Sequence, residues 1–373
     1  MKVLVVTVVH DPDDARIRHR QVRALLDAGH HVTMVAPFTA YDRPLPRDLS
    51  PVDVPRASGR RRLAALRAAA RELARRGRDH DVVLLHDPEL LLAALLVAGR
   101  LRQQVVVWDV HEDTGAALRM KSWLPAAARR LLPRVVRWAE RLAERRVHLL
   151  LAEESYADRF SRRHPVVPNT TVVPDGSPEP SRPGRAVYLG RLTPARGALE
   201  LVELGRRLRG DVVVELIGDA TADVEAAVAA AAVAGDVRWH GFVPNDRALT
   251  LLAGATAGLS LLHDQPNYAH SRPTKVLEYM AHGLPVVTTP NAASVALVEQ
   301  HGCGVVVPFG DVDALERAVR ALDADDVLRH RYAAAGRNAA EEGLTWSSDG
   351  AAFVAVLEAW AKTRRRPGPE QMQ

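Results

Sequence analysis

Short apolar runs alternate with longer amphipathic segments along the first part of the chain. The run at residues 3–9 is almost continuously apolar, which is typical of a strand buried in a parallel sheet. A segment with helical spacing follows at 17–28 and ends at Gly29. Further apolar runs occur at 32–36, 82–86, 105–110 and 149–152. This alternation predicts a doubly wound α/β domain, in which ligands bind beyond the carboxyl ends of the strands.

A second series of the same kind follows a cluster of proline and glycine at 165–184, which has the composition of a linker. Its predicted strands are 185–190, 212–217, 237–240, 257–262, 285–288 and 304–307. The alanine-rich segment 223–234 is predicted to be a helix, and 351–360 is predicted to be a final amphipathic helix before a frayed tail. The chain is therefore expected to form two α/β domains, 1–168 and 183–345.

Composition limits the classes of protein to consider. The 373 residues are 47% apolar, which suits a globular protein with two cores. The single cysteine, Cys303, rules out an internal disulfide and fits a reducing compartment. The apolar run at 3–9 is too short for a signal sequence or a membrane span, so a cytoplasmic protein is expected.

The net charge of +5 is unevenly distributed, because arginines are dense at 60–78 and 129–146. In 129–146 the helical spacing places arginines on one face and Leu131, Val135 and Trp138 on another. Such a helix could make peripheral contact with an anionic membrane, although a solvated helix face explains the same pattern. Trp138 is the single aromatic residue within these two arginine-rich segments, so nucleic-acid binding is not expected.

The segment 270–287 carries the strongest chemical signal. It predicts a polar loop, an amphipathic helix opening near Thr274, a stop at Gly283 and a buried strand. Lys275 in the first turn opposes the helix dipole, which indicates that an anion offsets its charge. Glu278, one turn later, could accept hydrogen bonds from a ribose diol. A capped helix with a solvated lysine is the alternative.

This segment, His-Ser-Arg-Pro-Thr-Lys followed by Glu-Tyr-Met-Ala-His-Gly-Leu-Pro-Val, resembles the donor-site signature of family-4 retaining glycosyltransferases of the GT-B fold. The resemblance implies two Rossmann-like doubly wound domains that face a cleft: an acceptor-binding domain at 1–168 and a nucleotide-sugar-binding domain at 183–345. It also implies that a helix at 346–363 crosses back to the N-terminal domain, leaving 364–373 as a tail.

The resemblance extends to other donor-site motifs. Gly190-Arg191-Leu-Thr-Pro-Ala-Arg196-Gly is similar to the turn whose basic pair binds the donor diphosphate, with Arg196 in place of the usual lysine. Gly218 and Gly241 each follow a strand, where a planar ring could approach the backbone. The remaining residues that the resemblance assigns to the donor are Phe242, Val243, His270, Pro273, Thr274 and Glu278. His270 stands where many relatives have a glutamate that contacts the donor sugar.

In the first half, Asp109-Val-His111-Glu112 resembles the family's Asp-x-His-Glu, whose histidine lies beside the reacting sugar. His86 lies in a second motif of this kind, with helix capping as its alternative role. The first strand-to-helix loop resembles the family's Asp-x-Arg-Ile, and its residues are assigned to the acceptor together with His86: His10, Asp14 and Arg16. Asp11-Pro-Asp13 also matches a metal-binding pattern of a different glycosyltransferase fold, which is taken as coincidence.

These expectations combine into a retaining glycosyltransferase that uses a nucleotide-diphosphate sugar with neither a metal nor a further cofactor. The catalytic residues would be His111, Arg191, Arg196 and Lys275. The acceptor would be a small molecule, a glycan or a lipid-linked molecule. A sugar-nucleotide epimerase and a non-catalytic partner subunit with the same fold are the alternatives.

Overall fold

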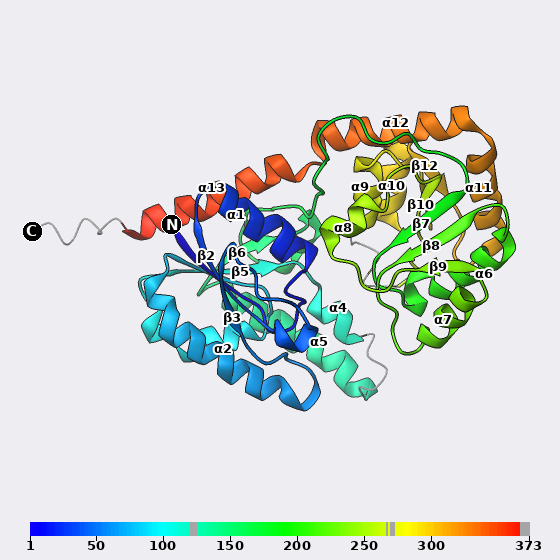
Figure 1. Cartoon of the computed structure of the whole chain (residues 1–373). Coiled ribbons are helices and arrows are strands. Elements are labelled where there is room, and N and C mark those ends of the chain that lie inside the picture. Colours follow the sequence, from blue (N-terminus) through cyan, green and yellow to red (C-terminus); the bar gives the residue numbers. More distant parts are fainter. Residues whose placement is uncertain (120–124, 266–267, 269–272, 366–373) are drawn as a thin grey trace, which may run out of the picture. The chain divides into compact units, whose positions relative to one another are not determined.

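The computed structural model describes residues 1–119, 125–265, 268 and 273–365. The chain divides into two units (Figure 1). Unit 1 contains Met1–Asn169 together with the C-terminal segment from Ser347, and unit 2 contains Thr170–Trp346. The segment rich in proline and glycine therefore belongs to unit 2 from Thr170 onward.

Unit 1 is built on a six-stranded parallel sheet with the order β3-β2-β1-β4-β5-β6, which confirms the predicted doubly wound topology. The strands are β1 (Lys2–Val6), β2 (His31–Ala36), β3 (Ser50–Asp53), β4 (Val82–Leu85), β5 (Val105–Val110) and β6 (His148–Leu151). The helices are α1 (Arg23–Asp27), α2 (Arg62–Arg76), α3 (Leu90–Leu96), α4 (Thr114–Arg119), α5 (Ala126–Ala143) and α13 (Trp346–Arg365). Apolar side chains of α2 and α3 cover one face of the sheet.

Two local features of unit 1 differ from the sequence-based expectation. The predicted helix at 17–28 begins earlier, as a π-helix over Ala15–Val22, and becomes α-helical only in α1. The edge strand β3 was not predicted, because Ser50-Pro51-Val52-Asp53 lacks an apolar run. Proline is tolerated there because an edge strand need not donate every ladder hydrogen bond.

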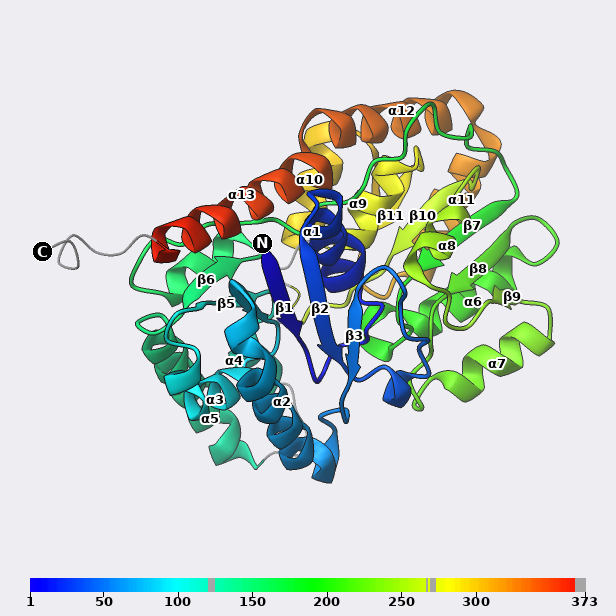
Figure 2. The same cartoon turned by 60° about the vertical axis from the view of Figure 1, so that its left-hand side comes forward.

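Helix α13 returns to the sheet of unit 1, as the fold prediction required (Figure 2). Glu358 on this helix lies 3.1 Å from Nε2 of His30, which precedes β2. Trp360 stacks on His148 at the start of β6, with 4.5 Å between the ring centroids. These contacts tie the end of the described chain to both halves of the N-terminal sheet.

Unit 2 repeats the architecture, with a parallel sheet in the order β12-β11-β10-β7-β8-β9. The strands are β7 (Arg185–Leu189), β8 (Val213–Ile217), β9 (Val237–Trp239), β10 (Ala257–Ser260), β11 (Val286–Thr288) and β12 (Gly304–Val306). The helices are α6 (Ala198–Leu208), α7 (Glu225–Val233), α8 (Asn245–Thr250), α9 (Thr274–Ala281), α10 (Ala292–His301), α11 (Val312–Ala324) and α12 (Asp326–Gly343).

Two apolar cores lie on opposite faces of this second sheet. One contains α6, α7 and α11, and the other contains α8, α9, α10 and α12. Helix α9 was predicted to be amphipathic, but Lys275 and all the residues after it in the helix are buried. Apolar neighbours therefore enclose the helix that carries the strongest chemical signal.

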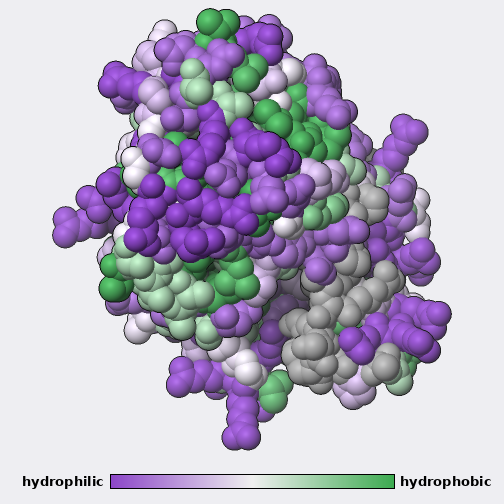
Figure 3. Space-filling model, turned by 90° about the vertical axis from the view of Figure 1, so that its right-hand side faces the viewer, coloured by the Kyte–Doolittle hydropathy of each residue, from purple (hydrophilic) through white to green (hydrophobic). Residues whose placement is uncertain are grey.

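The face of the molecule in Figure 3 is mostly hydrophilic, with apolar side chains in separate patches. A search of the described helices finds none with the length and hydropathy that a membrane span requires.

Candidate active site

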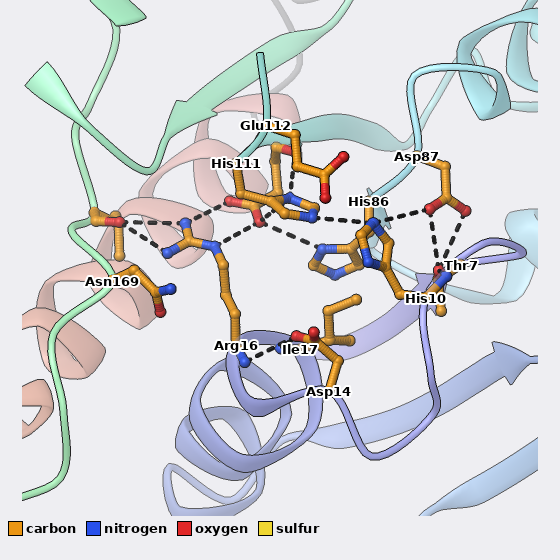
Figure 4. A network of polar contacts seen from close by, with 12 residues as sticks. Thr7, His10, Asp14, Arg16, Ile17, His86, Asp87, His111, Glu112 and Asn169 are labelled. Carbon is orange, nitrogen blue, oxygen red and sulfur yellow. Dashed lines mark hydrogen bonds and ion pairs between the residues drawn. The ribbon is translucent and has the colours of Figure 1, made fainter. Parts of the chain in front are cut away.

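The strand order of unit 1 reverses between β1 and β4, and the loops after these strands and after β5 carry a connected set of polar side chains (Figure 4). The carboxyl edge of a doubly wound sheet is open at such a reversal, because successive connections leave it in opposite directions. The network lies at this edge, the predicted place for a ligand.

Asp87, which follows β4, fixes the loop that leaves β1. Its carboxylate accepts hydrogen bonds from the backbone N–H groups of Val8 and Val9 and from the Thr7 hydroxyl. Its Oδ1 also lies 3.3 Å from His10 Nε2. Because the carboxylate is fully buried, these partners replace the water that it would otherwise bind. Asp87 thus holds the β1 loop so that His10 lies at the switch point.

Asp109, the penultimate residue of β5, forms a buried bidentate ion pair with Arg16. Arg16 Nε and an Nη donate to the two carboxylate oxygens at 2.8 and 2.7 Å, and the guanidinium also donates to the Val167 carbonyl at 3.2 Å. Burial alone would raise the pKa of Asp109, but Arg16 holds it well below the ordinary value. Asp14 supports the same π-helix by accepting from the N–H groups of Arg16 and Ile17.

His111 lies between this ion pair and His10. Its Nδ1 is 3.1 Å from Asp109 Oδ2, and its Nε2 is 3.2 Å from His10 Nε2. Burial lowers the pKa of His111, but the hydrogen bond and charge of Asp109 outweigh burial and raise it to about 9. His111 is therefore an imidazolium at neutral pH, with 11% of its side chain exposed.

Two of the predicted acceptor-binding side chains, Arg16 and His86, are buried beside Asp109. The guanidinium of Arg16 is 3% exposed, and its donors are occupied by Asp109 and Val167. The side chain of His86 is fully buried, with Nδ1 3.4 Å from Asp109 Oδ2, and burial lowers its pKa. Both side chains surround Asp109, and their predicted contacts with an acceptor stay predictions. Asp14 caps the π-helix, and the side chain of His10 is 16% exposed.

Among the described residues, one group of side chains has the composition of a metal site: His86, Asp109 and His111, whose potential ligand atoms lie within 4.8 Å of one another. Arg16 already binds both carboxylate oxygens of Asp109, so a divalent cation would compete with a guanidinium at that position. Asp11 and Asp13 of the Asp11-Pro-Asp13 pattern are not part of this group of potential metal ligands. Arg43 lies 2.8 Å from the Asp11 carboxylate and 3.7 Å from that of Asp13.

In unit 2 the strand order reverses between β7 and β10, and Tyr279 of α9 holds the two strands there. Its hydroxyl accepts from the Leu189 N–H and donates to the Leu259 carbonyl, both at 2.9 Å. The ring packs against Gly258, where a Cβ would come within 2.2 Å of it. Tyr279 therefore stabilises the opening of the sheet and fixes α9 beside it.

Lys275, in the first turn of α9, places its ammonium group in this opening. Lys275 is 8% exposed, and Nζ has no hydrogen-bond partner among the residues that the structure describes. Nζ lies 3.8 Å from the ring centroid of Tyr188 on β7, a cation–π contact. Burial lowers the pKa of Lys275 well below 10.5, and the charge of Arg196 lowers it further. A buried cation in this state would be stabilised by an anion.

The predicted donor glycines of unit 2 are packed together beside this lysine. Gly218 has a φ of 144°, and a Cβ there would lie 2.2 Å from the Gly190 carbonyl oxygen, so only glycine allows these loops to approach. The Gly218 N–H donates to the Gly241 carbonyl at 2.8 Å. A Cβ at Gly190 would lie 3.4 Å from Lys275 Nζ. The loops after β7, β8 and β9 therefore meet at the switch point.

The other predicted donor residues differ in exposure. Arg191 and Phe242 are exposed, whereas Arg196, Val243 and Thr274 are half-buried and Pro273 is buried. Glu278 is 4% exposed, one turn beyond Lys275 on the same helix. His270 lies outside the described residues. The predicted roles of these side chains stay predictions.

Four residues that organise the two switch points were not among the predicted site residues: Asp87, Asp109, Tyr188 and Tyr279. The two aspartates had a visible signal, because each is an acidic residue at the carboxyl end of an apolar strand. The two tyrosines gave no such signal, because an aromatic residue within an apolar strand or helix is normally interpreted as part of the hydrophobic core.

Comparison with known families and structures agrees with this architecture. Residues 15–176 match the family described as "Glycosyl transferase 4-like domain", and residues 183–325 match "Glycosyl transferases group 1". The chain belongs to the family-4 glycosyltransferases and is a glycosyltransferase enzyme with the GT-B fold. A comparison with curated protein sequences gives no match.

Several solved structures share the fold at low sequence identity. Sucrose-phosphate synthase from Thermosynechococcus elongatus has a TM-score of 0.73 at 16% identity, over 97% of this chain and 99% of that one. Anabaena HepE in complex with UDP-glucose gives 0.70 at 15% identity, over 96% and 100%. WaaG, a glycosyltransferase involved in lipopolysaccharide biosynthesis, gives 0.68 at 16%, over 95% and 99%. At these identities the likeness shows the fold alone.

Proposed function

We propose that this glycosyltransferase is a retaining enzyme that transfers a sugar from a nucleotide-diphosphate sugar to an acceptor hydroxyl, without a metal or a further cofactor. The observation that carries the proposal is Lys275, whose buried amine at the switch point of unit 2 has no hydrogen-bond partner in the described chain. A diphosphate bound there would supply the missing negative charge. The fold neighbour HepE, solved with UDP-glucose, supports a donor of this class.

In this proposal the donor site acts by electrostatic stabilisation. The bond between the anomeric carbon and the diphosphate oxygen breaks, and Lys275, Arg196 and Arg191 stabilise the negative charge that develops on the diphosphate. The acceptor oxygen bonds to the anomeric carbon from the face that the diphosphate leaves, so the configuration is retained. Its proton passes to the departing phosphate oxygen. No side chain acts as a covalent nucleophile in this scheme.

We assign the remaining roles as follows. His111 and His10 of unit 1, partly exposed members of the polar network, hydrogen-bond sugar or acceptor hydroxyls, and the backbone near Gly241 and Val243 contacts the nucleobase. Glu278 accepts hydrogen bonds from the ribose diol. We also place the enzyme in the cytoplasm, because the buried thiol of Cys303 suits a reducing compartment.

The test begins with a thermal-shift screen of sugar nucleotides in the presence of EDTA. The proper donor should raise the melting temperature, because it binds the native state only. Turnover is then measured with the same chelator, and the anomeric configuration of the product is determined by NMR. We expect donor-dependent transfer with retained configuration. Complete loss of turnover in EDTA, restored by manganese, would overturn the metal-independent mechanism.

Two control reactions separate the alternatives. Incubation with the donor alone distinguishes transfer from epimerisation, because an epimerase would change the sugar nucleotide without an acceptor. A purified single chain that binds donors but shows no transfer with any acceptor would favour the partner-subunit alternative.

A further inference from the structure

Two helices of unit 1 turn apolar faces to solvent. On α3 the leucines Leu92, Leu95 and Leu96 are exposed, the last at 79%. On α5 the exposed apolar residues recur at helical spacing and form one stripe: Leu131, Val135, Trp138 and Leu142. Trp138 is 67% exposed. A single exposed leucine needs no explanation, but seven exposed large apolar residues on two helices that border one groove indicate an interaction surface.

The two faces border one groove. Its volume is about 930 Å³, and its lining includes Leu92 and Leu95 from α3 and Trp138 and Leu142 from α5. Because all the lining residues belong to unit 1, the groove is a property of that unit alone. We call the groove together with the exposed residues of α3 and α5 the α3/α5 face.

The exposed charges of α5, which borders the α3/α5 face, are positive. The exposed arginines of α5 and of the turn after it are Arg130, Arg134, Arg141, Arg145 and Arg146. The acidic residues of the same stretch, Glu140 and Glu144, are both buried. Glu140 pairs with Arg159, and Glu144 accepts from the Ser161 and Arg162 N–H groups and lies 2.9 Å from His164 Nε2. The acids therefore face inward, and the outward charge of α5 is positive.

We propose that the α3/α5 face docks the enzyme peripherally on an anionic lipid bilayer. The leucines and Trp138 enter the boundary between headgroups and acyl chains, while the arginines beside them bind lipid phosphates. An indole ring suits this depth, because it is largely apolar but carries one N–H donor. A second copy of the chain would fit less well, since a symmetric contact would bring two sets of arginines together.

The electrostatic part is tested by co-sedimentation of the full chain with vesicles of phosphatidylcholine, with and without phosphatidylglycerol. We expect binding only when the anionic lipid is present, and weaker binding at high salt. The double variant Arg141→Gln/Arg145→Gln should bind about 30-fold more weakly, because each cation near an anionic surface contributes roughly fivefold. The matched control is Arg317→Gln/Arg331→Gln, which removes two exposed arginines from unit 2 and should bind like the native chain.

The apolar part is tested with Leu96→Gln/Trp138→Gln, against Val233→Gln/Val327→Gln as the control for exposed apolar residues in unit 2. The first variant should lose vesicle binding and the second should not. The tryptophan emission of the native chain should shift to the blue with anionic vesicles, and Trp138→Phe should remove that shift.

The variants Arg141→Gln/Arg145→Gln and Leu96→Gln/Trp138→Gln change only exposed side chains, so their melting temperatures should stay near the native value. A loss of vesicle binding would then not be due to unfolding. Equal binding to neutral vesicles, or equal losses in the control variants, would overturn the proposal. So would light scattering that shows a dimer of the native chain dissociated by Leu96→Gln/Trp138→Gln, because the face would then join two copies. None of these measurements requires a sugar donor, so their outcome is independent of the proposed reaction.

Discussion

The switch points of the two units have the same topology but different charge balances. In unit 1 the buried carboxylates of Asp87 and Asp109 have several partners each, supplied by backbone N–H groups, Arg16 and two histidines. In unit 2 the buried amine of Lys275 has an aromatic face beside it but no hydrogen-bond partner among the described residues. The first site completes its own charge pairing, whereas the second leaves the Lys275 amine without a hydrogen-bond partner among the described residues, which the proposed diphosphate would supply.

From this difference we expect the network of unit 1 to support the fold and the site of unit 2 to bind a ligand. A network whose members pair with one another stabilises the fold and holds His10 and His111 in place, whether or not a substrate is bound. A buried charge without a partner costs stability in the ligand-free protein, and an anion that binds there recovers that cost. Substitutions should therefore act mainly on stability in unit 1 and mainly on binding and turnover in unit 2.

The largest effect is expected from Asp109→Asn. The substitution leaves Arg16 as a buried cation without its anionic partner, and removing one member of such a pair costs about 3–5 kcal/mol. Urea unfolding measures the loss. The control is Asp27→Asn, which removes the exposed pair with Arg23 and should change the free energy of unfolding by about 1 kcal/mol at most. A loss below about 1 kcal/mol for Asp109→Asn would contradict the distinction between the two sites.

The converse behaviour is expected from Lys275→Met. Turnover should fall about 100- to 1000-fold, the typical effect of removing one group that stabilises transition-state charge. The melting temperature of the ligand-free protein should stay the same or rise, because an apolar chain replaces a buried amine without a hydrogen-bond partner. Lys362→Met, at an exposed position, is the control for turnover. Destabilisation without loss of nucleotide affinity would assign Lys275 to the core of the fold.

A pH dependence of stability is expected from His111, with a magnitude of about 3 kcal/mol at most. Its pKa in the folded protein is about 9, above the ordinary 6.5, so the protonated ring binds better in the folded state. The resulting stabilisation is complete below pH 6.5 and is lost as the pH rises through 9. Urea unfolding between these limits should show the decline, and His111→Gln should flatten it. An identical decline in the variant would attribute it to another group.

A smaller effect is expected from Arg196→Ala, which should weaken nucleoside-diphosphate binding by about 1.5–3 kcal/mol through loss of one charge-assisted contact. Calorimetry with the free nucleoside diphosphate measures it. Arg196→Lys should recover only part of the affinity, because an ammonium lacks the planar fork of a guanidinium. Unchanged affinity in Arg196→Ala would remove this residue from the proposed diphosphate site.

The alternation of apolar runs and amphipathic segments was sufficient to predict the two doubly wound sheets. A buried parallel strand must be apolar on both faces, so eleven of the twelve strands carry a readable signal. The exception is β3, a short edge strand with one proline and no fully buried residue, which needs no such run. The motif at 270–287 also located Lys275, because a lysine in the first turn of a helix is unusual by local rules alone.

Tertiary structure decided which of the predicted polar residues are available to a ligand. His86 and His111 are both histidines that directly follow a strand, yet the side chain of His86 is fully buried beside Asp109 whereas that of His111 is 11% exposed. The sequence specifies which loops meet at the switch point. Which side chain faces solvent depends on contacts between residues some 70 to 150 positions apart, such as those of Arg16 with Asp109 and Val167. The exposed apolar stripe of α5 could not be predicted from the sequence for the same reason. Helical spacing defines a face, but only the packed neighbours determine whether that face is covered.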